Sequence, residues 1–536
     1  MMKKCQKGIA VLLATLLFLL PGCGGESSSA NSGTEGGGST TTSEGEASQQ
    51  SSGAGNTFTF VTSSEPTTLD AHLCPGPTEG RIMRLINETL YYRDENSEVH
   101  PLLAESAESS EDRMTWTIHL KQGIKFHDGT PFNAEAVKFS FDRLLDPETA
   151  SPKASALSMV EETNVVDEYT VEVKLNSPNW IFLATLSNYT TAILSPTAVE
   201  KYGLDQYGQN PVGTGPMKLE KWDRGLEMSL VKNEDYWGEP ATVDRLIVKW
   251  APEDSTRVMM MQSGDADVAS NIPPIQVANL EADDNIEVVK VPGYRTISVG
   301  MNVAAEPLND ERVRLAINYA LGKQTIIDNV LSGQALYPSG FWSPAVEYSA
   351  KDLDAHEQDL EKARELLAEA GYPDGFTVKL TGSEGKFAMD RQVTEVVQAM
   401  LSEVGIHAEV EILDSAAHTE ALLTHNTQLF IFGKGCSTGD PEYDMQLHLV
   451  TDGGQNFYNY SDPETDKMIL EDLPNAADLE EREGIIYEIT KRFNDQSVVV
   501  PLYYEVQLYA VRSDVEGFVC YPNELAELAY MTRTES

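Results

Sequence analysis

The clearest alternation of apolar and polar positions lies between residues 357 and 435. It predicts helices at 357–370, 393–404 and 416–424, and strands at 376–381, 406–412 and 428–432. The first two helices are followed at once by glycines, Gly371 and Gly405, which are typical helix stops. The order strand, helix, strand, helix, strand predicts an α/β fold with a parallel sheet and right-handed crossovers.

Two loops leave the predicted strands at the edge where open α/β sheets bind ligands, beyond the carboxyl ends of the strands. One loop is 382–386, and the other is 433–440. The second lies within the stretch FGKGCSTGDPEYD, which sets Cys436, Ser437 and Asp440 within five positions. These residue types suit a nucleophile with its acid, part of a metal site, or a ligand-reading loop. The position therefore indicates ligand binding and leaves the chemistry open.

A second apolar alternation, at 115–120, predicts a strand that runs into the motif KFHDGTPFN. His127 and Asp128 resemble a catalytic pair, but Asp128-Gly129 is a turn signal and Asn133 can cap a helix at 134–145. We therefore interpret the motif as structural. The glycine-rich stretch 211–216 lacks the Lys-Ser/Thr of a phosphate loop, which argues against nucleotide binding.

The N-terminus has a different pattern: lysines, then an apolar run at 8–20 that is too short to span a bilayer. It ends in Leu-Pro-Gly-Cys, which resembles the lipobox of bacterial lipoproteins. We expect 1–22 to be a removed signal peptide and Cys23 to carry a lipid, which anchors a chain without spanning the membrane. An ordinary secretory signal is the alternative.

Residues 24–56 contain almost only small and polar side chains and no aromatic residue, which predicts a disordered tether for 23–56. No later apolar run approaches 18 residues.

Charge and cysteine content narrow the function classes. The formal net charge is −45, which disfavours nucleic acid and anionic lipid as partners. Beyond Cys5 and Cys23, the cysteines are Cys74, Cys436 and Cys520. They form no CxxC pair and are odd in number, so neither a disulfide framework, a zinc site nor another cofactor is indicated.

Several short segments occur together in a recognisable order. They are EPTTLD at 65–70, PLLAES at 101–106, KFHDGTPFNAE at 125–135, GTGP at 213–216, NEDYW at 233–237, GDAD at 264–267, VRLAINYA at 313–320, LLAEAGY at 366–372 and VGI at 404–406. Behind the signal and tether, this series resembles the extracellular solute-binding proteins of the peptide/nickel family (family 5), which serve ABC importers.

The resemblance implies a two-lobed, hinge-connected fold of the periplasmic-binding-protein type (type II, large class). Lobe I is expected at 57–295, with an extra subdomain at about 96–212. The chain is expected to return to lobe I at 507–536. Lobe II is expected at 296–506. Two crossings, near 291–302 and 501–507, would form the hinge on which the lobes close around a ligand.

The resemblance also implies site residues. Family members that bind peptides often carry Trp-x-x-Asp before an Asp-Pro or Glu-Pro, and that aspartate pairs with the ligand amino group. Here Asp440-Pro441 is present, but the two motif positions fall on Lys434 and Ser437. The position of the carboxylate-binding arginine in dipeptide binders falls on Glu384, with Lys386 two residues on. Glu65 matches a ligand-side acid of some oligopeptide binders. The expected ligand-binding residues are Glu65, Lys386, Gly435, Cys436, Ser437 and Asp440.

The resulting hypothesis is a lipid-anchored, extracytoplasmic and monomeric receptor of an ABC importer. It would capture a peptide or peptide-like solute and deliver it to a membrane permease. The alternatives are a sensor that docks on a signalling partner and a binder of metal chelates or other solutes. An enzyme built on Cys436 or Ser437 would need a nearby base. Because His425 and His448 are not motif-spaced, we expect no enzymatic activity.

Overall fold

The computed structural model describes residues 56–534 except Pro75 and Ser437. Eleven strands form one mixed sheet, whose order is β15-β14-β16-β12-β17-β11-β1-β10-β9-β8, with β13 also paired to β17. In this order they span Ile406–Asp414, Phe376–Glu384, Leu429–Lys434, Ile286–Met301, Val499–Arg512, Val268–Ala269, Thr57–Thr62, Arg245–Trp250, Glu227–Lys232 and Met217–Asp223; β13 is Ala335–Leu336.

The lobe II part of this sheet contains the strands predicted from the apolar pattern. β14 pairs in parallel with both β15 and β16, so the predicted parallel sheet is confirmed. The three predicted helices are α9 (Leu360–Glu369), α10 (Asp390–Glu403) and α11 (Ser415–Leu423). β14 runs to Glu384, three residues beyond the predicted end, because its ladder with β15 continues to Asp414.

Alternating side chains pack on the two faces of the lobe II sheet. In β16, Leu429 and Ile431 join a core with α7 (Glu311–Ala320), α8 (Lys323–Asn329), α9 and α10. Phe430 and Phe432 point into a second core. That core includes side chains of α12 (Glu442–His448) and α14 (Leu479–Asp495). A short helix, α13 (Pro463–Lys467), lies between them in sequence.

Lobe I repeats this two-sided packing. Phe58 and Phe60 of β1 join a core with α1 (Pro77–Ile86) and α4 (Pro196–Tyr207), whereas Val61 joins a core with α5 (Asp254–Ser263) and α6 (Val277–Leu280). Short antiparallel pairs complete its C-terminal end: β18 (Val515–Glu516) with β21 (Thr532–Arg533), and β19 (Val519–Cys520) with β20 (Ala526–Glu527).

A separate core lies within the region expected to be the extra subdomain. Its four-stranded sheet has the order β4-β5-β7-β6, with strands Ala104–Ser109, Thr115–Leu120, Thr170–Leu175 and Val160–Asp167. It packs with α2 (Ala134–Leu145) and α3 (Phe182–Thr185), and the pair β2 (Tyr91–Arg93) and β3 (Val99–Pro101) precedes it. The Asn133 side chain accepts from the Ala136 amide, so the predicted cap is confirmed.

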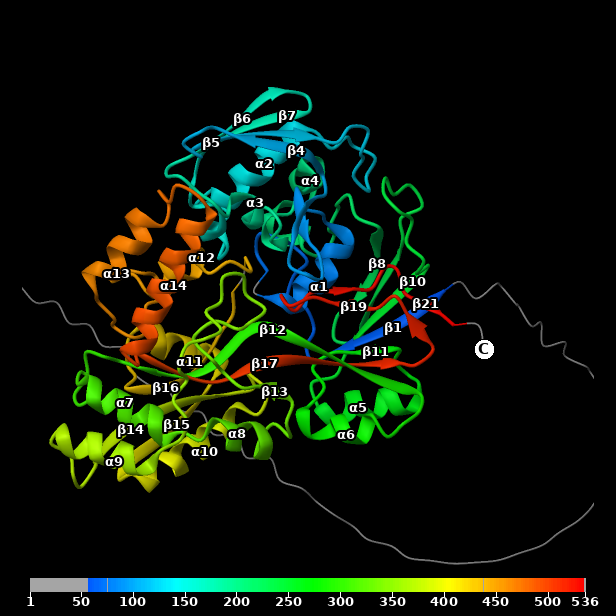
Figure 1. Cartoon of the computed structure of the whole chain (residues 1–536). Helices are drawn as coiled ribbons and strands as arrows, with labels where there is room; N and C mark the ends of the chain where they lie inside the picture. Colours follow the sequence, from blue (N-terminus) through cyan, green and yellow to red (C-terminus); the bar gives the residue numbers. More distant parts are fainter. Residues whose placement is uncertain (1–55, 75, 437, 535–536) are drawn as a thin grey trace, which may run out of the picture. The chain divides into compact units, whose positions relative to one another are not determined.

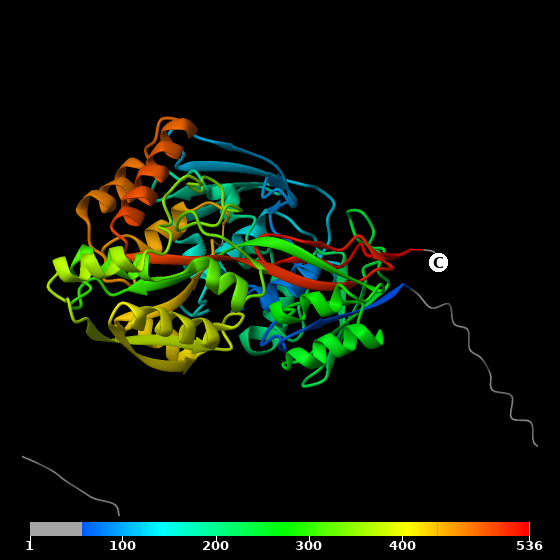
Figure 2. The ribbon, with the colours of Figure 1, turned by 60° about the horizontal axis from the view of Figure 1, so that its bottom comes forward.

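The long strands β12 and β17 connect the two halves of the large sheet. They run side by side through the centre of the views in Figures 1 and 2 and pair antiparallel from Ile286–Arg512 to Gly300–Val499. The ladder is interrupted between Pro292 and Thr296. This break lies where the chain was expected to cross between lobes, and we propose it as the hinge.

Candidate functional site

The loop after β16 lies against the junction of the lobes. β16 ends at Lys434, and α12 begins at Glu442. Gly439, between them, has φ +73°, and a Cβ there would lie 2.7 Å from Tyr294 Oη and 3.1 Å from Arg93 Cζ. Since Arg93 belongs to lobe I, the end of its side chain meets a loop of lobe II here, and the positive φ of Gly439 favours glycine at this contact.

A cavity of about 330 Å³ opens beside this loop, which is within the range of small-molecule sites. Lobe I contributes Arg93, Lys153, Tyr189, Asn523 and Glu524; lobe II contributes Lys434, Gly435, Cys436, Tyr443 and Asp444; Tyr294 and Arg295 line it where β12 crosses. The Tyr443 hydroxyl donates to Ser155 Oγ at 2.8 Å across the same junction. The cavity therefore has walls from both lobes and contains the loop predicted from the sheet edge.

The side chain of the predicted residue Asp440 does not line the cavity and makes its contacts within lobe II. Its Oδ1 accepts from Arg482 NH2 at 2.8 Å and from the Glu442 amide at 2.9 Å, and its side chain is buried. The same Arg482 nitrogen donates to Glu442 Oε2 at 2.9 Å. Burial, followed by the nearby Asp440 carboxylate, raises the pKa of Glu442 to about 7. One arginine therefore pairs with both carboxylates, and neither carboxylate lines the cavity.

Lys434 and Cys436 do line the cavity. Lys434, at the position of the family tryptophan, forms a buried ion pair with Asp444. The Cys436 thiol donates to the Asp440 carbonyl at 3.2 Å, and burial, followed by the Asp444 charge, raises its pKa well above the ordinary value. A protonated, hydrogen-bonded thiol is a poor nucleophile.

Lys386 and Glu65 lie outside this lining. Lys386 Nζ donates to Thr419 Oγ1 at 2.9 Å, and burial together with Arg295 lowers its pKa. Glu65 accepts from Trp222 Nε1 at 3.0 Å and from the Gly225 amide at 3.1 Å, both on the β8–β9 hairpin of lobe I. Of the predicted ligand residues, the structure thus brings Gly435 and Cys436 to the cavity. Ser437 and Cys23 lie outside the described residues.

Sequence reasoning missed Arg93, Tyr294 and Arg295. None of them belongs to a motif, and each reaches the cavity through folding of a distant segment, so no local signal marks them.

The motif around His127 has a structural role. His127 Nε2 donates to the Gly215 carbonyl at 2.9 Å, and Asp128 accepts from Ser195 Oγ at 2.7 Å. A Cβ on Gly213 would lie 2.0 Å from the Ile86 carbonyl oxygen, so the glycine-rich stretch serves close backbone packing.

A larger hollow of about 1480 Å³ lies between the 96–99 loop, the 344–352 segment and α14. Its lining carries nine carboxylates and one lysine: Glu98, Glu347, Asp352, Glu464, Asp472, Glu480, Glu481, Glu483 and Glu488, with Lys351. Both hollows have walls from both lobes, and we prefer the smaller one as the ligand site because it contains the predicted loop residues Gly435 and Cys436.

Within the described residues, one group of side chains has the composition of a cation site. The ligand atoms of Asp94, Glu98 and His100 lie within 4.8 Å of one another. Asp94 already accepts from His100 Nε2 at 2.9 Å and from the Asn96 and Glu98 amides, so it closes the turn of this hairpin. Cys74, Cys436 and Cys520 are free and buried. Across residues 56–534 outside the two gaps, no helix is long and apolar enough to cross a membrane.

Comparison with known proteins agrees with this architecture. The family described as bacterial extracellular solute-binding proteins, family 5 (middle region), matches residues 98–456. The glutathione-binding protein GsiB of Salmonella typhi is 32% identical over 468 residues, which cover 85% of this chain and 90% of that protein.

Two solved structures extend the comparison. The ABC transporter-associated periplasmic binding protein DppA of Helicobacter pylori, in complex with the peptide STSA, has 26% identity and a TM-score of 0.78, covering 89% of this chain and 98% of that one. The ABC transporter substrate-binding protein CtaP of Listeria monocytogenes has 22% identity and a TM-score of 0.81, covering 90% of this chain and all of that one, and supports the fold.

Proposed function

Because this chain belongs to the bacterial extracellular solute-binding proteins of family 5, we propose that it captures a peptide or peptide-like solute between its lobes and delivers it to an ABC permease. The two-lobed fold that the resemblance implied is confirmed. Like its relatives, the chain is a binding protein and not an enzyme.

The observation that carries the proposal is the cavity between the lobes. Its walls come from segments as distant in sequence as Arg93, Lys434 and Glu524. A site built from both lobes couples binding to their closure, because a ligand that contacts both walls stabilises the closed arrangement. A permease that recognises this arrangement then distinguishes loaded from empty receptor.

A peptide-like ligand is supported by the relatives. The relative that is 32% identical is a glutathione-binding protein, and the H. pylori structure holds a peptide. The volume of about 330 Å³ suits a small solute. Since Lys434 and Ser437 replace the Trp-x-x-Asp pattern, the usual way of reading a free amino terminus is missing. Glutathione and short peptides are therefore the first ligands to test.

Native mass spectrometry on protein purified without refolding should show a bound solute, and calorimetry should then give its affinity. The calorimetry panel is glutathione and di- to pentapeptides, each free and N-acetylated. Binding of at least one member supports the proposal. If N-acetylation leaves the affinity unchanged, the protein does not bind the amino group of the ligand. Absence of binding across the panel would reject the peptide-like class.

The lipid anchor is a separate part of the proposal, supported by the lipobox-like Leu-Pro-Gly-Cys ending at Cys23. One acyl-modified chain end and a tether would hold a monomeric receptor at the outer face of the cytoplasmic membrane. Cys23→Ala should move the protein from the membrane fraction to the soluble fraction or the medium. Retention of the variant in the membrane would contradict the anchor.

A further inference from the structure

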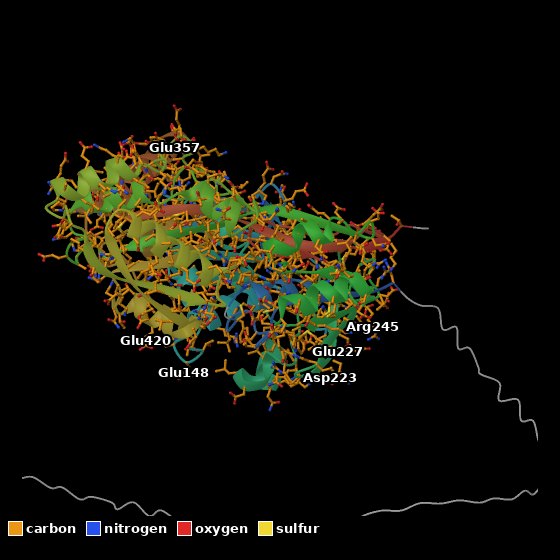
Figure 3. The ribbon with its side chains drawn as sticks, turned by 90° about the horizontal axis from the view of Figure 1, so that it is seen from below. Glu148, Asp223, Glu227, Arg245, Glu357 and Glu420 are labelled. Atoms are coloured by element: carbon orange, nitrogen blue, oxygen red, sulfur yellow. The ribbon has the colours of Figure 1, made fainter. Side chains whose placement is uncertain are left out.

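The charged lining of the interlobe cavity differs in sign from the rest of the protein. Four cations line it, Arg93, Lys153, Arg295 and Lys434, against two carboxylates, Asp444 and Glu524, a difference of +2. The whole chain has a net charge of −45. Exposed acids such as Glu148, Glu357 and Glu420 lie on the outer face in Figure 3. The positive lining is therefore a local feature and not a result of composition.

Two of the four cations are balanced by the two carboxylates of the lining. Lys434 pairs with Asp444, and Arg295 pairs with Glu524. Arg295 also lies 3.4 Å from Glu505. These pairs involve both carboxylates of the lining.

Arg93 is a further cation of this lining. Its side chain is buried, with 8% of the residue exposed. NH1 donates to the Ser97 carbonyl, and Nε is buried with no hydrogen-bond partner. Among the described residues, no carboxylate forms an ion pair with it. A buried charge without a paired anion is costly, so such a group normally has a partner.

Resting on the proposed function, we propose that Arg93 binds a carboxylate of the solute and that the solute is a small peptide-like anion. A guanidinium presents a planar fork of donors that matches a carboxylate in two hydrogen bonds. Arg93 also packs against Gly439 of the lobe II loop, so an anion bound here would touch both lobes.

A purely structural role for Arg93 makes a different prediction. The NH1 bond to the Ser97 carbonyl closes the 94–98 turn, and Ser97 Oγ lies 2.7 Å from Tyr294 Oη. If Arg93 only held this turn, its loss would weaken all ligands alike and lower the melting temperature. If it binds the ligand carboxylate, its loss removes discrimination between an acid and its neutral derivative.

The test uses two matched probe pairs on the full chain in mild detergent: trialanine with trialanine amide, and glutathione with glutathione diethyl ester. The wild type should bind the acids at least ~30-fold more tightly than the neutral derivatives, the usual loss when one partner of a buried charge pair is removed. Arg93→Gln should bind acids and derivatives equally, and Arg93→Lys should retain part of the difference. The exposed Arg364→Gln, an equal change in net charge, is the control and should behave as wild type.

Two results would overturn the assignment while leaving solute capture intact. One is that the wild type binds the amide or the ester as tightly as it binds the corresponding acid. The other is an acid-to-derivative ratio that persists in Arg93→Gln. Failure of all four probes to bind would overturn the assignment, and the wider panel of di- to pentapeptides would then decide whether the peptide-like class is rejected as well.

Discussion

Two buried charge clusters, one in each lobe, differ in their ratio of acid to base. In lobe I, Arg143 donates to both oxygens of Asp70, at 2.6 and 3.1 Å, and its NH1 lies 2.9 Å from His72 Nδ1. In lobe II, Arg482 serves two carboxylates, Asp440 and Glu442. The first cluster is neutral when the imidazole is unprotonated, whereas the second carries one negative charge in excess when both acids are ionised.

The two clusters consequently respond to protons in opposite directions. Burial, followed by Arg143, lowers the pKa of His72 to about 4, so its neutral form is favoured in the folded protein. Burial and Asp440 raise the pKa of Glu442 to about 7, so its protonated form is favoured. A lower pH should therefore destabilise the fold through the cluster of lobe I and stabilise it through the cluster of lobe II. In both clusters every charged group has a partner of opposite charge, whereas among the described residues Arg93 forms no ion pair.

The largest expected effect is on stability, from Arg482→Met. It leaves Asp440 and Glu442 buried without their cation, which should lower the free energy of unfolding by about 3–5 kcal/mol. Urea denaturation at pH 7.5 measures the loss.

The matched control for Arg482→Met is Lys491→Met on the same helix, α14. This lysine pairs with Asp495 at an exposed i,i+4 position, and such pairs contribute only about 0.3–0.5 kcal/mol. Similar losses in the two variants would mean that the buried cluster of lobe II does not stabilise the fold.

The next effect is a pH dependence in lobe I. Because the folded pKa of His72 is about 4 and the unfolded value is about 6.5, the unfolded chain binds the extra proton as pH falls. The contribution of neutral, buried His72 to the free energy of unfolding is complete above pH 6.5. It is lost as the pH falls to 4, by up to about 3 kcal/mol. His72→Gln keeps an acceptor for Arg143 and a donor for the Ala192 carbonyl, so its disadvantage against wild type should shrink between pH 7 and pH 4.5.

Urea titrations at these two pH values measure the difference. The exposed His407→Gln should leave the pH dependence unchanged. A disadvantage of His72→Gln that stays constant with pH would show that His72 does not titrate as its burial requires.

An effect of similar size, with the opposite sign, should come from Glu442→Gln. As pH rises from about 4.5 to 7, ionising a buried acid whose folded pKa is raised reduces stability. The variant should match wild type near pH 4.5, where Glu442 is protonated, and exceed it at pH 8 by up to about 3 kcal/mol, because the pKa shift is as large as that of His72. Thermal melts across this range test the sign, and a variant that is less stable at pH 8 would contradict it.

The sequence alone predicted the local structure of lobe II well. The helices and strands between 357 and 435 were expected within a few residues of their bounds, because apolar spacing and the stops at Gly371 and Gly405 act over short distances. The parallel pairing followed from the order of elements, and from it the position of the 433–440 loop beside a cavity.

The charges of the site could not be predicted in the same way. Asp440 meets Arg482 and Glu65 meets Trp222 across 42 and 157 positions of sequence, respectively. Arg93 approaches Gly439 from the other lobe. No periodicity or motif encodes such contacts, which arise only when separate cores pack. Spacing indicated which loop lies beside the cavity, but not which charged side chains line it or how they pair.

The position of Cys436 makes its labelling rate a measure of how often the lobes separate. Its thiol lines the cavity with 1% of the residue exposed, whereas Cys74 and Cys520 belong to the core of lobe I. While the lobes are together, Cys436 is shielded from a maleimide and held in its unreactive protonated form. If the lobes part as we propose, water should reach the thiol and alkylation should begin. The rate of labelling at Cys436 should then report how often the receptor opens, and a bound solute should slow this labelling.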